Sequence, residues 1–218
     1  MRYDNVHNRK TKSIMIDIIL IIKALSILFI ALISPGPDFV VVLRNSLTFG
    51  RKSGIATAIG IAAGCTISFS LVLIGLDFLF KYQIIKQIMS IACGLYLVHM
   101  GISAFRSKSQ HRHFKYSQQR AKSSLTYFRT GFLTNLLNPK LYTFCTAILS
   151  YVEQSHPSRA TNITIVVGQA IMALIWFTAI CYIFSSSKVQ DAYFKREIWI
   201  NRTLGIIFIF IGIKIIIG

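Results

Sequence analysis

The sequence predicts an all-α, polytopic membrane protein with six transmembrane helices, on three observations. Of its 218 residues, 54% are hydrophobic and 14% are charged, whereas about 25% of the residues of a soluble domain are charged. The apolar residues form long blocks, and the basic residues gather between them, as in chains that cross a bilayer several times. Proline-containing breaks interrupt the first and the fourth of these blocks.

The order of the blocks divides the chain into four parts. Residues 1–14 are a polar N-terminal extension, and residues 15–105 are a first three-helix repeat. A basic linker, expected in the cytoplasm, covers residues 106–129, and a second three-helix repeat covers residues 130–218. A signal peptide is a weaker interpretation of the start, because no small-residue cleavage site follows the first block.

The first break is Ser34-Pro35-Gly36-Pro37-Asp38. The prolines lack N–H groups and cannot continue a helix, and Gly36 tolerates any bend between them. Inside a bilayer, broken backbone persists only where protein buries it or where it lines a wet cavity. Asp38 is therefore a candidate site for a substrate or a coupling ion. The alternative is a helix end at the interface, with Asp38 as an ordinary acid of its first turn.

The second break lies in the fourth block and contains Asn135, Asn138, Pro139 and Lys140. Pro139 removes one helix hydrogen bond, and two amides and an ammonium lie within about one and a half turns. We expect the two breaks to face each other, where half-helix N-termini can bind a carboxylate. In the alternative interpretation, these residues only shape and cap the broken helices.

Both halves of the chain follow the same plan. Pro139 follows Pro35 by 104 residues, and Gly168 follows Gly64 by the same interval. The third and sixth blocks each carry two glycines seven residues apart, Gly94 and Gly101 in one and Gly205 and Gly212 in the other. Because each half has three spans, successive halves must lie upside down relative to each other. Inverted repeats with broken helices at matching positions are typical of secondary transporters.

The distribution of Lys and Arg predicts the orientation. Fourteen of them lie in the connections after the first, third and fifth blocks, and seven lie on the opposite side. The last of these connections, residues 185–202, is predicted to be a basic loop. The positive-inside rule places the fourteen in the cytoplasm and both termini outside it. This distribution also explains the net charge of +17 without a nucleic-acid partner.

Enzyme chemistry has little support in the sequence. The cysteines all lie in apolar blocks, form no C-x-x-C pair and are expected to be small buried hydrophobic residues: Cys65, Cys93, Cys145 and Cys181. There is no H-E-x-x-H, G-x-S-x-G or P-loop motif. We therefore expect no catalytic residues, no metal and no cofactor.

Three stretches resemble the LysE/RhtB family of lysine and homoserine/threonine exporters. SPGPDFVVVLRNSLTFGRKSGIATAIGIAAG (34–64) resembles its signature, GFLTNLLNPKLYTFCTAIL (131–149) its second motif, and GLYLVHMGISAFRS (94–107) its third-span pattern. The resemblance implies a bacterial inner-membrane exporter of amino acids or their derivatives, driven by the proton gradient. Many members carry an acid after the last glycine of the signature, where this chain has Cys65.

The resemblance carries over to the residues of both breaks. Asp38 is expected to bind the substrate ammonium or a proton, the amides of Asn135 and Asn138 to bind the substrate, and Lys140 to attract its carboxylate. A buried Lys140–Asp38 ion pair that opens on substrate binding fits the cost of burying either charge alone. The framework of the breaks would be Pro35, Gly36, Pro37 and Pro139.

The expected partners are an amino acid, protons and the lipid bilayer, and the glycine-rich spans are compatible with a homodimer. Three alternatives remain. The protein could export another small solute, or a cation or metal, whose export would need Asp38 but not Lys140. It could be a non-transporting scaffold that recruits partners through residues 106–129, or an integral-membrane enzyme.

Overall fold

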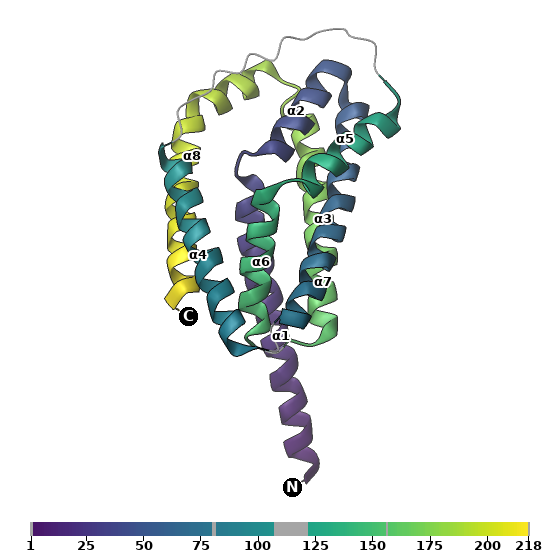
Figure 1. Cartoon of the computed structure of the whole chain (residues 1–218). Helices are drawn as coiled ribbons and strands as arrows, with labels where there is room; N and C mark the ends of the chain where they lie inside the picture. Colours follow the sequence, from purple (N-terminus) through teal and green to yellow (C-terminus); the bar gives the residue numbers. More distant parts are fainter. Residues whose placement is uncertain (1, 80–81, 107–121, 156, 218) are drawn as a thin grey trace.

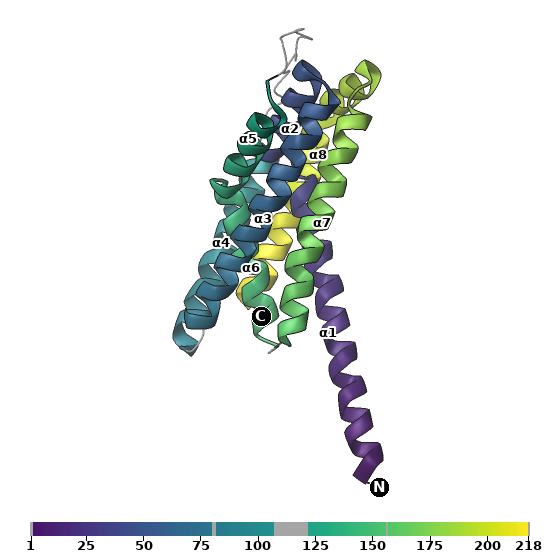
Figure 2. The ribbon, with the colours of Figure 1, turned by 90° about the vertical axis from the view of Figure 1, so that its right-hand side faces the viewer.

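The structure, a computed structural model, describes residues 2–79, 82–106, 122–155 and 157–217. This part of the chain contains helices and no strands. The helices are α1 (Arg2–Ile33), α2 (Pro37–Phe49), α3 (Arg51–Leu79), α4 (Gln83–Arg106), α5 (Ser124–Leu136), α6 (Pro139–Glu153), α7 (Arg159–Ile183) and α8 (Ser187–Ile217). They form an elongated bundle from which the start of α1 projects (Figures 1 and 2).

The first predicted break separates α1 from α2, and the two helices are bent by 56°. Pro37 occupies the first turn of α2, where a missing N–H costs no helix hydrogen bond. Gly36 is the N-cap with φ −162° and ψ −174°, an extended conformation that any residue adopts. The prolines therefore make the bend, and the freedom expected of Gly36 is not used.

The second predicted break separates α5 from α6. Pro139 opens α6, and the Asn138 side chain caps it by accepting a hydrogen bond from the Lys140 N–H. Leu137 ends α5, and its N–H donates to the Leu133 carbonyl. Both breaks therefore place a proline in the first turn of the second half-helix.

Three helices of the described chain are long and apolar enough to cross a membrane: Arg51–Gly75, Arg159–Ile183 and Lys195–Ile217. The bent pair Asp17–Ile33 and Pro37–Phe49 makes a fourth candidate if it is one span. By length and composition, the six predicted spans are thus supported only in part. Large apolar side chains on the outer faces, such as Ile74 on α3, Ile175 on α7 and Phe210 on α8, are more than 60% exposed, as expected of surfaces that face lipid.

Glycines set the closest helix contacts. A Cβ at Gly101 of α4 would meet the carbonyl of Gly205 of α8 at 2.6 Å, and a Cβ at Gly212 would meet that of Gly94 at 2.6 Å. The order of these pairs shows that α4 and α8 pack antiparallel. α3 and α5 approach in the same way at Gly60, where a Cβ would clash with the Phe128 carbonyl. Small residues at these crossings let the backbones touch, as in other membrane helix pairs.

Apolar clusters fill the space between the helices. Phe39 and Leu43 of α2 pack with Phe177 of α7, and Leu28 of α1 packs with Phe69 of α3. A third cluster joins the α4–α8 pair to α1 and α6 through Ala31, Leu97, Phe144, Ala147, Phe208 and Ile215. This cluster thus anchors the α4–α8 pair to the rest of the bundle.

Two predicted boundaries differ from the observed ones. The basic segment 185–202, predicted as a loop, is helical from Ser187 and continues into the last span. α5 begins at Ser124, before the predicted start at 130, because the Ser123 side chain caps it. Most of the predicted linker, residues 107–121, lies outside the described residues.

Candidate functional site

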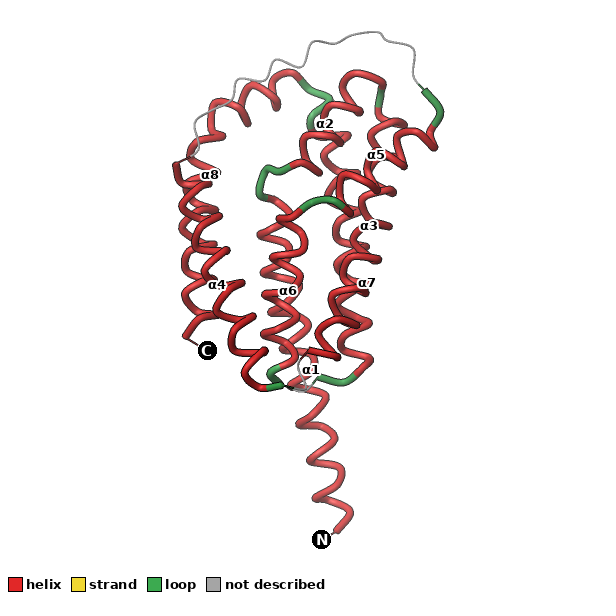
Figure 3. The backbone as a smooth tube through the Cα atoms, in the orientation of Figure 1, coloured by secondary structure: helices red, strands yellow, loops and turns green. Residues whose placement is uncertain are grey.

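The carboxylate of Asp38, in the first turn of α2, is held by both amides of the second break. Its Oδ2 accepts hydrogen bonds from Asn135 Nδ2 at 2.9 Å and from Asn138 Nδ2 at 3.1 Å. Asn135 lies in the last turn of α5, and Asn138 is the N-cap of α6. The prediction that the two breaks face each other is thereby confirmed, and Figure 3 shows the two interruptions side by side within the bundle.

Asn138 serves both half-helices at once. Its Oδ1 accepts from the Lys140 N–H at 3.1 Å, while its Nδ2 donates to Asp38. The cap therefore fixes the direction in which the amide points. Serine and aspartate are equally good caps, but neither offers an amide donor to the carboxylate.

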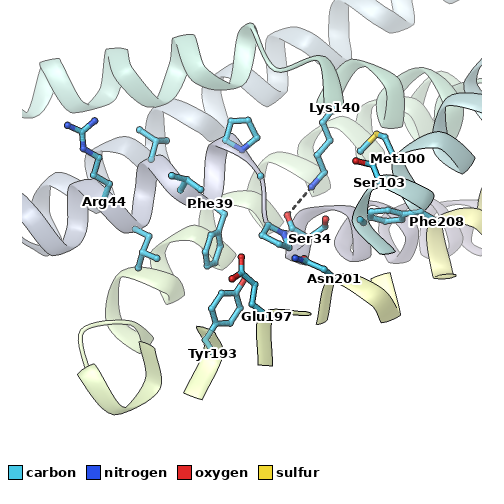
Figure 4. A pocket seen from close by; sticks show the side chains of 17 residues that line it. Ser34, Phe39, Arg44, Met100, Ser103, Lys140, Tyr193, Glu197, Asn201 and Phe208 are labelled. Carbon is cyan, nitrogen blue, oxygen red and sulfur yellow. Dashed lines mark hydrogen bonds between the residues drawn. The ribbon is translucent and has the colours of Figure 1, made fainter. Parts of the chain in front are cut away.

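Lys140 lies at the first turn of α6, and its Nζ donates to the backbone carbonyl of Ser34 at 2.9 Å (Figure 4). The break leaves carbonyl groups at the C-terminus of α1 without helical partners, and an ammonium is favourable there. In the described part of the chain, Lys140 is not ion-paired with Asp38. The expected Lys140–Asp38 pair is thus replaced by two separate interactions.

Cys65, which follows the last glycine of the stretch 34–64, faces the site. It is buried, and its Sγ accepts a weak hydrogen bond from Asn135 Nδ2 at 3.4 Å. The preceding Gly64 makes room for Asn135, because a Cβ there would come within 2.9 Å of its Oδ1. The other described cysteines, Cys145 and Cys181, are also free and buried, as predicted.

A small chamber of about 50 Å³ adjoins Asp38 and is lined by Cys65, Asn135, Asn138 and Gln169 among others. Three buried oxygens of these residues find no hydrogen-bond donor in the described chain: Asp38 Oδ1, Asn135 Oδ1 and Gln169 Oε1. Buried acceptors without donors are costly. The chamber therefore suits a species that brings donors or positive charge, such as a proton, a hydronium ion, an ammonium group or a small cation.

A second, larger cavity of about 660 Å³ lies between the first break and the α4–α8 pair. Its polar lining comes from α2, α4, α6, α8 and the break itself (Figure 4): Ser34, Arg44, Ser103, Lys140, Tyr193, Glu197 and Asn201. Sequence reasoning missed the α8 residues, since their segment was predicted to be a loop. The available signal was the four-residue spacing of Tyr193, Glu197 and Asn201, which places them on one helix face.

The described residues include no group of three or more His, Cys, Asp or Glu side chains that could hold a metal ion. The polar groups that do converge are the carboxylate of Asp38, three amides and the ammonium of Lys140. This set can bind protons, cations and the charged ends of a zwitterion, and it contains no paired nucleophile and base.

Comparison with known proteins gives matches over most of the chain. Residues 29–218 match the family of LysE type translocators. The chain is 28% identical over 193 residues to a threonine efflux protein of Salmonella typhi, covering 87% of this chain and 93% of the relative. It is 28% identical over 192 residues to the threonine efflux protein of Escherichia coli K12, with the same coverage. An uncharacterized membrane protein of that strain, YahN, is 27% identical over 82% of this chain and 80% of its own length. No solved structure matches.

Proposed function

Because the chain belongs to the LysE type translocator family, we propose that it exports an amino acid from the cytoplasm, driven by the proton gradient. The observation that carries the proposal is the environment of Asp38, an acid at a helix break that two amides hold and whose Oδ1 has no donor in the described chain. The relatives named threonine efflux protein make threonine the first cargo to test.

The proposed architecture is six membrane crossings in two inverted repeats, with α1–α2 and α5–α6 as the broken spans. Equivalent glycines in equivalent contacts support it. Gly64 of α3 contacts Asn135 of α5, and Gly168 of α7 contacts Leu25 of α1. Each middle helix thus uses its glycine to receive the broken span of the other half, as an inverted repeat requires.

The proposed location is the bacterial inner membrane, with both termini outside the cytoplasm. The start of α1 and the end of α8 lie towards one end of the bundle (Figure 1), and the basic start of α3 lies at the other. The positive-inside rule assigns this second end to the cytoplasm.

Asp38 would carry the coupling proton. When it is ionised, the two amide donors and nearby Lys140 offset part of the cost of the buried charge. When it is protonated, its Oδ1 becomes a donor, for which Asn135 Oδ1 and Gln169 Oε1 are acceptors on the same chamber wall. Both states can therefore be stabilised at one position, which a carrier that alternately loads and releases a proton needs.

The largest functional effect is expected for Asp38→Asn. Everted membrane vesicles take up an exported amino acid, so uptake of labelled amino acids, threonine first, measures export. Wild-type vesicles should accumulate the cargo when energised and lose this accumulation when an uncoupler is added. Asp38→Asn should abolish accumulation, because the amide cannot carry a proton.

The control is Asp191→Asn, which removes an exposed acid near the start of α8 and should leave accumulation unchanged. Accumulation by Asp38→Asn at the wild-type level would contradict the role of Asp38. Three unpartnered oxygens would also suit Na⁺, so the assay is repeated with choline in place of Na⁺. Dependence on Na⁺ with no effect of the uncoupler would replace the proton by a cation.

A further inference from the structure

The chamber beside Asp38 is too small for an amino acid in this conformation. Its volume of about 50 Å³ has room for roughly three to five water molecules, at the 10–15 Å³ that each requires. The adjacent cavity of about 660 Å³ is within the range of about 300–1,000 Å³ that is usual for ligand pockets. Of the two spaces, the large cavity therefore has the size of an amino-acid site.

Four residues line both compartments and form the partition between them: Ser34, Gly36, Phe39 and Lys140. The hydrogen bond from Lys140 Nζ to the Ser34 carbonyl joins two of these residues. Lys140 is therefore the charged group that a ligand in the large cavity and a charge change at Asp38 can both influence.

The wall opposite Lys140 comes from α8. Among the described residues that line the large cavity, Glu197 is the one acid, and Figure 4 shows its carboxylate directed into the cavity, with Asn201 one turn further along the helix. α2 begins beside the same cavity, and its N-cap Gly36 offers no side-chain acceptor to the free N–H groups of the first turn. The cavity thus presents negative charge on one wall and positive charge on the other.

We propose that this large cavity is the cargo site and that it takes a zwitterionic α-amino acid, with the ammonium bound by Glu197 and Asn201 and the carboxylate by Lys140 and the N-terminus of α2. The inference rests on the proposed function and assigns to it residues outside the two helix breaks. The cargo carboxylate competes with the Ser34 carbonyl for Lys140, so cargo binding loosens the partition beside Asp38. The side chain of the cargo lies among Val40, Met100 and Phe208, which line the same cavity.

The test is uptake of labelled L-threonine, or of the amino acid that the wild type transports in the panel above, into everted vesicles. Three variants are compared with the wild type: Glu197→Gln, Glu197→Asp and the control Asp191→Asn. Glu197→Gln should raise KM about 10- to 100-fold, the usual effect of losing a hydrogen bond between charged groups. Glu197→Asp should recover much of this loss, and Asp191→Asn should match the wild type.

A competition experiment separates binding of the ammonium from a structural effect. The competitor is the α-hydroxy acid analogue of the cargo, which keeps the carboxylate and lacks the ammonium. The analogue should inhibit uptake by Glu197→Gln at least as strongly as it inhibits uptake by the wild type. The pH dependence of uptake by this variant should stay unchanged. Asp38→Asn should show the opposite pattern, with energised accumulation lost and binding of the labelled cargo retained.

Two outcomes would overturn the inference while the proposed function stands. One is a KM of Glu197→Gln equal to that of Asp191→Asn. The other is an equal loss of affinity for the amino acid and for its α-hydroxy analogue, which would mark Glu197 as a structural residue. Absence of energised uptake of any amino acid by the wild type would overturn the proposed function itself.

Discussion

The first helix break supplies a carboxylate and leaves the N-terminus of α2 without a side-chain cap. The second supplies the donors, two amides and the ammonium of Lys140, and its Asn138 caps α6. At the first, Gly36 gives α2 no side-chain cap, and Asp38 follows in the first turn. At the second, Asn138 caps α6 and donates to Asp38 with the same amide. Matching prolines thus set matching geometry, while the residues around them divide the chemistry: the first break carries the negative charge, and the second holds it in place.

The largest effect on this arrangement is expected at the contact between α3 and α5, which positions the second break. α5 lies so close to α3 that a Cβ at Gly60 would clash with the backbone carbonyl of Phe128, and backbone cannot turn aside as a side chain does. Gly60→Ala should force the helices apart and withdraw Asn135 from Asp38, with a loss of about 1–3 kcal/mol or more from overpacking. Size-exclusion profiles of the detergent extract and cargo export measure the outcome.

Gly75→Ala is the matched control on the same helix, since a Cβ there meets nothing within 4 Å. It should leave both measurements unchanged. If Gly60→Ala behaved in the same way, the close packing of α3 and α5 would not be what holds the second break against the first.

The two tasks of Asn138 can be separated by two substitutions. Asn138→Ser keeps a capping oxygen and loses the donor to Asp38, whereas Asn138→Ala loses both. Both variants should export poorly. Asn138→Ala should in addition lose about 1 kcal/mol more thermal stability than Asn138→Ser, because it also lacks the cap. Melting curves of the purified variants, set against their uptake rates, decide the matter, and full export by Asn138→Ser would remove the Asp38 contact from the mechanism.

The sequence predicted both breaks and their mutual approach because the signals are local. Proline in a helix leaves few conformations, and Asp38, Asn135 and Asn138 are polar residues in apolar blocks, which must find one another. Their contacts at 2.9 and 3.1 Å confirm the approach. Their roles in transport stay predictions.

The second wall of the large cavity could not be predicted in the same way. Glu197 and Asn201 lie in a charged segment between the last two apolar blocks, and such a segment predicts a loop at the membrane surface. Whether such a residue faces lipid, water or a cavity depends on how α8 packs against α4, and the glycine contacts that fix this packing lie further along α8, at Gly205 and Gly212. The bond from Lys140 to the Ser34 carbonyl was likewise invisible, because its acceptor is a backbone atom without a residue-type signal.

The smallest effect, and the one that distinguishes the two breaks most finely, is expected from Gly36→Ala. The extended backbone of Gly36 accepts alanine, and the substitution removes freedom from the unfolded chain, so stability should stay constant or rise by about 0.4–1 kcal/mol. The new Cβ would lie 3.4 Å from Lys140 Nζ, so cargo affinity should fall modestly. Gly50→Ala should lower stability and leave cargo affinity unchanged. Gly50 has φ 92° with open space around it, so a side chain there strains only the backbone. A lower melting temperature of Gly36→Ala with normal cargo affinity would contradict this prediction. The first break would then depend on the conformational freedom of Gly36, and the added Cβ would not disturb Lys140.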